Sequence, residues 1–275
     1  MEENAIEEIE VDIRPANTFN YDVQEFQIEP GKSISSILEM NGLEVTNLGT
    51  IELSTIPAIH LEKRMGYLIH YPHGCVEQTT SAVFPQLFLS QLSQLSAKEE
   101  QSVTSNVKAG LQRLQLFQTA SGGFGYWPGE TQENEWGTNY AGHFILESEA
   151  LGYKIPMKMK ERWISYQKQA ARNWSQFYSA NTDQYNSSQL TQAYRLYLLA
   201  MANQPEIGSM NRLREEKQLS TTAKWRLASA YYLIGQKDAA SKLTQSASSD
   251  VQKYKELSGS FGSDLRDRAV ILEAM

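Results

Sequence analysis

Residues 71–81 read Tyr-Pro-His-Gly-Cys-Val-Glu-Gln-Thr-Thr-Ser and contain the single cysteine of the chain, Cys75. Pro72 and Gly74 favour a turn, and the residues after Cys75 favour a helix. The sequence therefore places Cys75 where a loop enters a helix. A helix dipole favours negative charge at its N-terminus, so a thiolate is stabilised there. We predict that Cys75 is a reactive group.

Gln78 follows Cys75 by three residues. Residues three apart in a helical turn lie on one face, which brings the Gln78 carboxamide to the Cys75 sulfur. Attack of the thiolate on the carboxamide, with loss of ammonia, would join the two side chains as a thioester. Because a thiolate leaves more readily than an amide nitrogen, an incoming amine could then take the Gln78 acyl group and free the thiol. The spacing predicts a stored electrophile.

The motif Gly-Cys-x-Glu-Gln at residues 74–78 resembles the thioester motif of the alpha-2-macroglobulin and complement family. Its form here, with Val76 after the cysteine and residues 71–73 before it, resembles the bacterial members. Further stretches that share the resemblance are residues 12–16, 61–69, 84–85, 122–127, 136–144 and 262–267. Since these stretches span nearly the whole chain, we identify it as similar to the thioester domain of a bacterial alpha-2-macroglobulin.

The pattern of apolar residues predicts a mostly α protein. Over residues 57–275, apolar residues recur at helical spacing in about ten segments joined by short loops. Repeated hairpins of this kind favour a closed ring of hairpins over a four-helix bundle or a solenoid. Residues 11–54 instead favour a few short strands, such as Val23–Ile28 and Thr50–Leu53, too few to complete a sheet alone. We therefore expect a partial β-sandwich segment over residues 1–56 and a helical domain over residues 57–275.

The resemblance adds detail to this expected fold. It implies that the helical part is an α/α toroid of six hairpins, of the terpenoid-cyclase-like kind. It also implies that residues 1–56 are part of a CUB-like β-sandwich that the toroid interrupts. Because residues 264–275 end in a helical pattern without a capping residue, we expect the toroid to be truncated at its C-terminal end.

A thioester hydrolyses in water, so the site needs an apolar cover. The resemblance implies that aromatic residues surround the thioester pocket. The candidates for this shielding are Tyr67, Tyr71, Phe84, Tyr126, Trp127 and Trp136. Each of them would also suit an ordinary core position.

Two further residues are candidates for the chemistry. Glu77 could act as a local acid or hydrogen-bond acceptor, although the helix dipole alone also favours a glutamate there. His143 is a candidate general base, which sequence separation neither supports nor excludes. Complement-like members carry a histidine further along the chain, in a stretch that corresponds to residues 182–186 here and contains none. The resemblance therefore supplies no base at that place.

Composition excludes several classes of partner. The chain has 275 residues and a net charge of -7, with acidic residues gathered in the first twelve, which argues against nucleic acid. One cysteine allows no intrachain disulfide and no Cys-rich zinc site. The four histidines show no metal-ligand pattern, and we expect no metal and no cofactor. No apolar run is long enough to span a membrane.

The resemblance implies a single-use covalent protease trap and not an enzyme. Cleavage elsewhere in the parent protein would expose the thioester, and a lysine amine of the attacking protease would be captured on Gln78. The parent, with its other domains outside this sequence, would be periplasmic or at the cell surface and would serve in host defence. A membrane anchor of the parent would also lie outside this sequence. Two alternatives stay open: an acyltransferase or transglutaminase-like enzyme that uses Cys75 and His143, and a non-catalytic helical scaffold with an inert Cys75.

Overall fold

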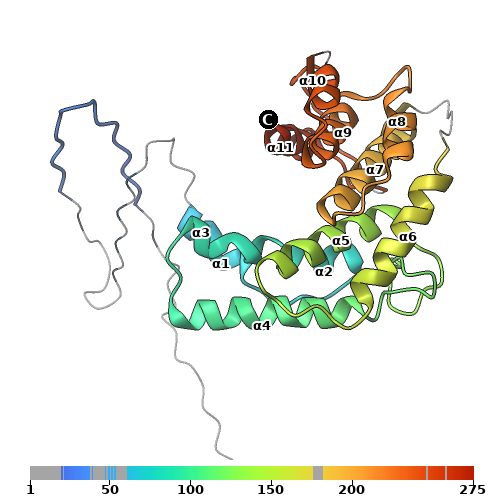
Figure 1. Cartoon of the computed structure of the whole chain (residues 1–275). Helices are drawn as coiled ribbons and strands as arrows, with labels where there is room; N and C mark the ends of the chain where they lie inside the picture. Colours follow the sequence, from blue (N-terminus) through green and yellow to red (C-terminus); the bar gives the residue numbers. More distant parts are fainter. Residues whose placement is uncertain are drawn as a thin grey trace, which may run out of the picture. The chain divides into compact units, whose positions relative to one another are not determined.

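The computed structural model describes most of the chain (Figure 1). The described residues are 20, 22–37, 39, 47, 49, 51, 53, 61–175, 182–245, 247–257 and 259–275, with side chains except at 61–64 and 182–187. The chain divides into two compact units, Met1–Ile59 and His60–Met275.

The described residues of the first unit form no strand. Residues 23–28, where the sequence favours a strand, adopt neither helix nor sheet, and Val23 and Phe26 are exposed. A turn follows, in which the N–H of Lys32 donates to the carbonyl of Glu29 at 3.0 Å. A strand requires a neighbour for its backbone groups, and the described part of the chain provides none. The predicted partial β-sandwich is not confirmed, and the remaining residues of its range lie outside the described ones.

The second unit is helical, so the predicted mostly α fold is confirmed. Its helices are α1 (Leu61–Leu68), α2 (Val76–Val83), the 3-10 helix η1 (Pro85–Phe88), α3 (Leu89–Leu92), α4 (Ala97–Leu114), α5 (Glu135–Ala150), α6 (Met159–Asn173), α7 (Thr182–Met201), α8 (Ile207–Arg214), α9 (Thr221–Leu233), α10 (Lys237–Gln245) and α11 (Asp264–Ala274). None of the helices in the described ranges has the length and apolar character needed to cross a bilayer.

The helices alternate between two rows. One row runs in chain order through α2, α5, α7, α9 and α11, each packed on the next. The other row consists of α4, which packs on α2 and α5, α6 on α5 and α7, α8 on α7 and α9, and α10 on α9. Helical hairpins thus follow one another as the sequence predicts. Closure of these hairpins into a toroid stays a prediction.

Local sequence fixes where several helices begin. Ser96 and Glu99 form a capping box at the start of α4. Asn134 accepts the N–H of Gly137 at 2.7 Å to cap α5, and Ser220 and Ser263 cap α9 and α11 in the same way. These caps satisfy N–H groups that would otherwise lack partners within the helix.

Close packing holds α5 against α6. The indole of Trp163 is fully buried and donates from Nε1 to the carbonyl of Thr138 at 2.9 Å. A Cβ at Gly142 would overlap the Trp163 ring, so this approach requires glycine. The packing matters for the site because α5 is a neighbour of α2.

Pro85 ends the regular helix that starts at Cys75. Proline has no N–H to donate, and α2 stops at Val83 before the 3-10 turn of η1. The buried Gln86 then donates from Nε2 to the carbonyls of Ala82 and His70 at 2.8 and 2.9 Å. This side chain ties the end of α2 to the loop that leads into Cys75.

Candidate functional site around Cys75

Cys75 is the N-cap residue of α2, in extended conformation with ψ 176°. Its main-chain N–H donates to Oε1 of Gln78 at 3.1 Å. In return the N–H of Gln78 donates to Sγ of Cys75 at 3.4 Å. The two residues form a reciprocal capping box, in which the sulfur replaces the usual hydroxyl. The three-residue spacing thus places the two side chains side by side, with Cys75 only 1% exposed and Gln78 exposed.

Gly74 makes this contact possible. Its φ is +83°, in the left-handed region where glycine is favoured. A Cβ at this position would overlap Oε1 of Gln78 and lie 3.0 Å from its Cδ. The residue before the cysteine must therefore be glycine both for its backbone and for the space that the carboxamide occupies.

A side chain from α4 supports this turn. Arg113 donates from Nη2 to the carbonyl of Gly74 at 2.9 Å and from Nε to Oγ1 of Thr79 at 3.1 Å. Thr79 is fully buried and donates from Oγ1 to the carbonyl of His73 at 3.4 Å. Sequence reasoning missed Arg113, since no local motif marks a contact between residues so far apart in the chain.

Tyr126 is the aromatic candidate that reaches the cysteine. Its carbonyl accepts the N–H of Val76 at 3.0 Å, and its own N–H donates to Oε2 of Glu130 at 2.8 Å. A side-chain hydrogen bond to Cys75, together with burial, raises the pKa of Tyr126 to about 12. The hydroxyl therefore stays protonated at neutral pH and can donate to the sulfur.

Phe261 packs against the Tyr126 ring. The two rings stack with centroids 6.5 Å apart and an interplanar angle of 18°. Trp127 meets the same tyrosine edge-on at 5.7 Å. Phe261 immediately precedes the stretch 262–267 that the resemblance includes, yet the sequence offered no signal that its ring would reach the loop of Tyr126.

Three of the other five shielding candidates are exposed. Tyr67, Tyr71 and Trp127 are 84%, 63% and 49% exposed, so this chain does not bury them over the sulfur. They belong to surface loops or the end of a short helix, where little other chain covers them. Phe84 is partly buried and packs against Tyr140 and His143, and Trp136 packs against Tyr194 at 5.5 Å. These latter two belong to the packing between helices.

Glu77 has a local partner. Its Oε1 accepts the hydroxyl of Ser81, one turn later on α2, at 2.8 Å. Its charge is also among the minor causes that raise the pKa of Tyr126 and Tyr140. This placement agrees with the reading of Glu77 as a hydrogen-bond acceptor in the first turn of the helix.

The structure places His143 in a separate cluster. It lies on α5, is 9% exposed, and its Nδ1 shares a hydrogen bond of 2.8 Å with the hydroxyl of Tyr194. Its Nε2 lies 3.6 Å from Oε1 of Glu147, and its ring meets Phe84 edge-on at 4.9 Å. Among the described residues, no hydrogen bond joins His143 to Cys75. The geometry does not assemble the pair that a cysteine enzyme would need.

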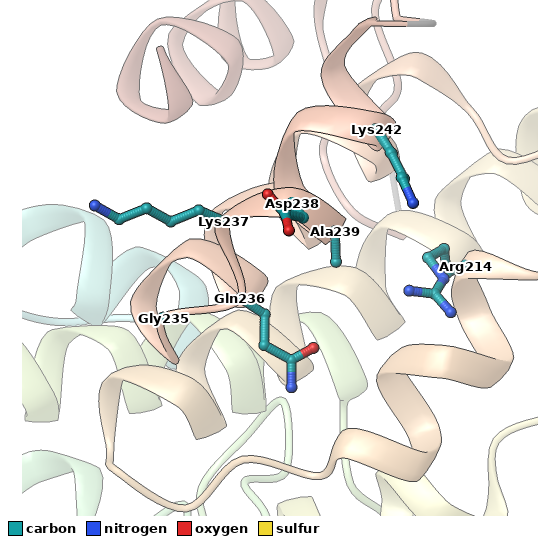
Figure 2. A pocket seen from close by; sticks show the side chains of 7 residues that line it. All are labelled: Arg214, Gly235, Gln236, Lys237, Asp238, Ala239 and Lys242. Atoms are coloured by element: carbon teal, nitrogen blue, oxygen red, sulfur yellow. The ribbon is translucent and has the colours of Figure 1, made fainter.

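A hollow of about 430 Å³ lies at the start of α10, away from the residues around Cys75. It is lined by Arg214, Gly235, Gln236, Lys237, Asp238, Ala239 and Lys242 (Figure 2). Figure 2 shows Lys237 pointing away from Arg214 and Lys242, so the three cations do not converge. Within the described ranges no group of three or more His, Cys, Asp or Glu side chains is arranged to hold a metal ion.

Comparison with known proteins connects this geometry to one family. Residues 50–173 match the family model of the A-macroglobulin TED domain. Alpha-2-macroglobulin of Escherichia coli (strain K12) is 28% identical over 280 residues, which cover 95% of this chain and 16% of that protein. The crystal structure of Salmonella alpha-2-macroglobulin reacted with methylamine is 26% identical, with a TM-score of 0.68 over 80% of this chain and 15% of that one. Escherichia coli alpha-2-macroglobulin activated by porcine elastase is 25% identical, with a TM-score of 0.60 over 74% and 19%.

Proposed function

The chain resembles the thioester domain of bacterial alpha-2-macroglobulins, and from this premise we propose that it is the reactive domain of a protease inhibitor of that kind. In this proposal Cys75 and Gln78 form an internal thioester that captures an attacking protease once. The observation that carries the proposal is the reciprocal contact between the two residues, with Sγ and Oε1 each bound to the main-chain N–H of the other.

Thioester formation needs a nucleophile and a leaving group, and the two side chains provide them. The Cys75 thiolate attacks Cδ of Gln78, and negative charge moves onto Oε1. The C–N bond of the carboxamide then breaks, and the nitrogen leaves as ammonia after taking up a proton. The product contains one C–S bond in place of one C–N bond, with no oxidation or reduction.

In capture, Cδ is again the electrophile, and the sulfur changes from nucleophile to leaving group. A lysine amine attacks Cδ of the thioester, the C–S bond breaks, and the amine loses a proton as the amide forms. The Cys75 thiolate leaves beside the N–H of Gln78, at 3.4 Å, and beside the hydroxyl of Tyr126. Both groups can donate a hydrogen bond to the negative charge on the departing sulfur. In this proposal each chain captures one amine.

The larger protein around this domain is also proposed from the relatives. The chain spans about 16% of the length of the Escherichia coli protein that it matches. One of the similar structures is Escherichia coli alpha-2-macroglobulin activated by porcine elastase. By analogy, proteases would be the targets here, their lysine amines would be captured, and other domains of the parent would control exposure of the thioester. We also propose a periplasmic or cell-surface location for the parent.

Intact mass spectrometry tests the proposal directly. The folded protein should be lighter than its sequence by one ammonia and should lack a free thiol. Methylamine should add to Gln78 and release one thiol per chain. Cys75→Ser is the matched control, since serine still caps α2 but cannot form the thioester, and it should show the full sequence mass and no adduct. Full sequence mass, a free thiol and no methylamine adduct in the wild-type protein would contradict the proposal.

A further inference from the structure

We propose that the main-chain N–H of Cys75 stabilises the oxyanion that develops on Oε1 of Gln78, and that Gly74 is required because it leaves room for this oxygen. The inference rests on the proposed function and assigns catalytic roles to groups of the Gly74–Cys75 peptide unit. It concerns both steps of the chemistry, since the same oxygen carries the negative charge in thioester formation and in amine capture.

The oxygen that becomes negative during the reaction already has a hydrogen-bond donor. Oε1 of Gln78 already accepts the N–H of Cys75 at 3.1 Å. When a nucleophile adds to Cδ, the C–O double bond opens and Oε1 becomes negative. A donor that is in place before reaction stabilises this charge without any reorganisation. The bond lies at the N-terminus of α2, where the helix dipole also favours negative charge.

A cationic side chain binds the other end of the Gly74–Cys75 peptide unit. The carbonyl of Gly74 accepts Nη2 of Arg113 at 2.9 Å, and the N–H of the same peptide unit binds Oε1. A cation at the carbonyl polarises the peptide and strengthens its N–H as a donor. Arg113 is therefore a positioning residue that acts on the oxyanion through the Gly74–Cys75 peptide.

A side chain at position 74 would occupy the space of the reacting oxygen. A Cβ there would overlap Oε1 and would lie 3.0 Å from Cδ and 3.1 Å from Cβ of Gln78. Any L-residue with a side chain must therefore push the carboxamide away from the N–H of Cys75. The steric requirement concerns the reacting oxygen itself.

Two glycine variants separate this role from backbone strain. Gly74→Ala and Gly152→Ala both force alanine into the left-handed region, at φ +83° and +86°. Only the first meets Gln78, because a Cβ at Gly152 has no atom within 4 Å. We expect Gly74→Ala to lower the yield of thioester, and to slow methylamine capture in whatever thioester forms by roughly a hundredfold to a thousandfold, the usual effect of losing an oxyanion donor. Gly152→Ala should react as the wild type does.

The comparison is made at a temperature where circular dichroism shows both variants folded. Thioester yield is read from intact mass, and the capture rate from release of the thiol. The inference is overturned if Gly74→Ala forms thioester and reacts within a few-fold of Gly152→Ala. Failure of the wild type to react at all would instead overturn the proposed function.

A second measurement does not depend on a glycine variant. The chain has one cysteine, so labelling with ¹⁵N-cysteine gives a single main-chain amide resonance. If Oε1 holds the N–H of Cys75, this proton should exchange slowly with solvent in the wild type and faster in Gln78→Ala. If the wild type captures methylamine but its Cys75 N–H exchanges as fast as that of Gln78→Ala, the oxyanion role is rejected and the proposed function stays intact.

Discussion

Arg113 donates from Nη2 to the carbonyl of Gly74 at 2.9 Å, across 39 positions of the chain. Its Nε binds Oγ1 of Thr79 at 3.1 Å. One side chain of α4 thereby fixes both the turn before Cys75 and the first turns of α2. Arginine suits this place because its planar group can donate in two directions at once, whereas lysine offers a compact charge.

Arg113→Met should therefore affect both stability and reactivity. Methionine retains much of the length of the side chain but donates no hydrogen bond, so the unfolding free energy should fall by about 1–3 kcal/mol. Methylamine capture should slow, since the Gly74–Cys75 peptide loses its hydrogen bond from Arg113. The stability and capture rate of Arg113→Lys should lie between those of the wild type and Arg113→Met. Urea unfolding and thiol release measure these effects.

Arg172→Met is the control for this prediction. Arg172 also binds a partner through two nitrogens, Glu206, but its side chain is 64% exposed on α6. Its loss should lower the unfolding free energy less than Arg113→Met does, because water screens an exposed ion pair, and should leave the capture rate unchanged. Equal capture rates in Arg113→Met and Arg172→Met would show that Arg113 does not act on the site.

Tyr126→Phe isolates the hydroxyl beside the sulfur. The ring can still stack on Phe261, so the unfolding free energy should stay within about 1 kcal/mol of the wild-type value. The departing thiolate, however, loses a donor, and a hydrogen bond to a charged group is worth about 1.5–3 kcal/mol. We expect methylamine capture to slow by roughly tenfold or more. Tyr232→Phe, an exposed tyrosine on α9, is the control, and identical rates for the two variants would reject a role for the Tyr126 hydroxyl.

The contact between Cys75 and Gln78 could be predicted from the sequence because both residues lie in one helical turn. Spacing alone brings such residues together, whatever the rest of the fold does. Arg113 and Phe261 could not be found in this way. The position of Arg113 depends on how α4 packs against α2, and that of Phe261 on how its segment meets Tyr126. No local pattern in the sequence records such long-range packing.

The predicted strand over Val23–Ile28 shows the opposite limit. The valine, phenylalanine and isoleucine there suit a strand, but a strand forms only where another chain segment pairs with it. His143 is a similar case. Its residue type suits a general base, while its actual partner is the hydroxyl of Tyr194. Residue type suggests a possible role, and only the packing of α5 against α7 decides its surroundings.

The pair Arg226 and Glu273 predicts a dependence of stability on pH. Burial would raise the pKa of Glu273, but the hydrogen bond and charge of Arg226, at 2.8 Å, outweigh it, and the pKa is lowered. A carboxyl with a lower pKa in the folded state stabilises the fold above its unfolded pKa, and this stabilisation is lost as the pH falls through the folded pKa. The unfolding free energy should therefore decrease as the pH is lowered from about 5.

Glu273→Gln should flatten that decline, because glutamine does not titrate. Urea unfolding of both proteins measures this between about pH 3 and pH 6, the range in which ordinary carboxyl groups titrate. The difference in unfolding free energy between them should shrink as the pH falls. A difference that stays constant over this range would show that Glu273 does not contribute through its charge.

We expect the thioester to react much faster with amines than with hydroxyls. A free amine attacks unaided, whereas an alcohol needs a base to remove its proton, and such a base is typically worth about a hundredfold to ten-thousandfold. His143 is the last histidine of the chain and binds Tyr194, and Tyr126, with its pKa raised to about 12, stays protonated at neutral pH. Equal concentrations of methylamine and glycerol, with adducts at Gln78 compared by mass spectrometry, test this preference. Cys75→Ser should give neither adduct. Glycerol ester yields equal to or above the amide yields would show that a base does act here, and His143→Ala and Glu77→Gln would then identify it.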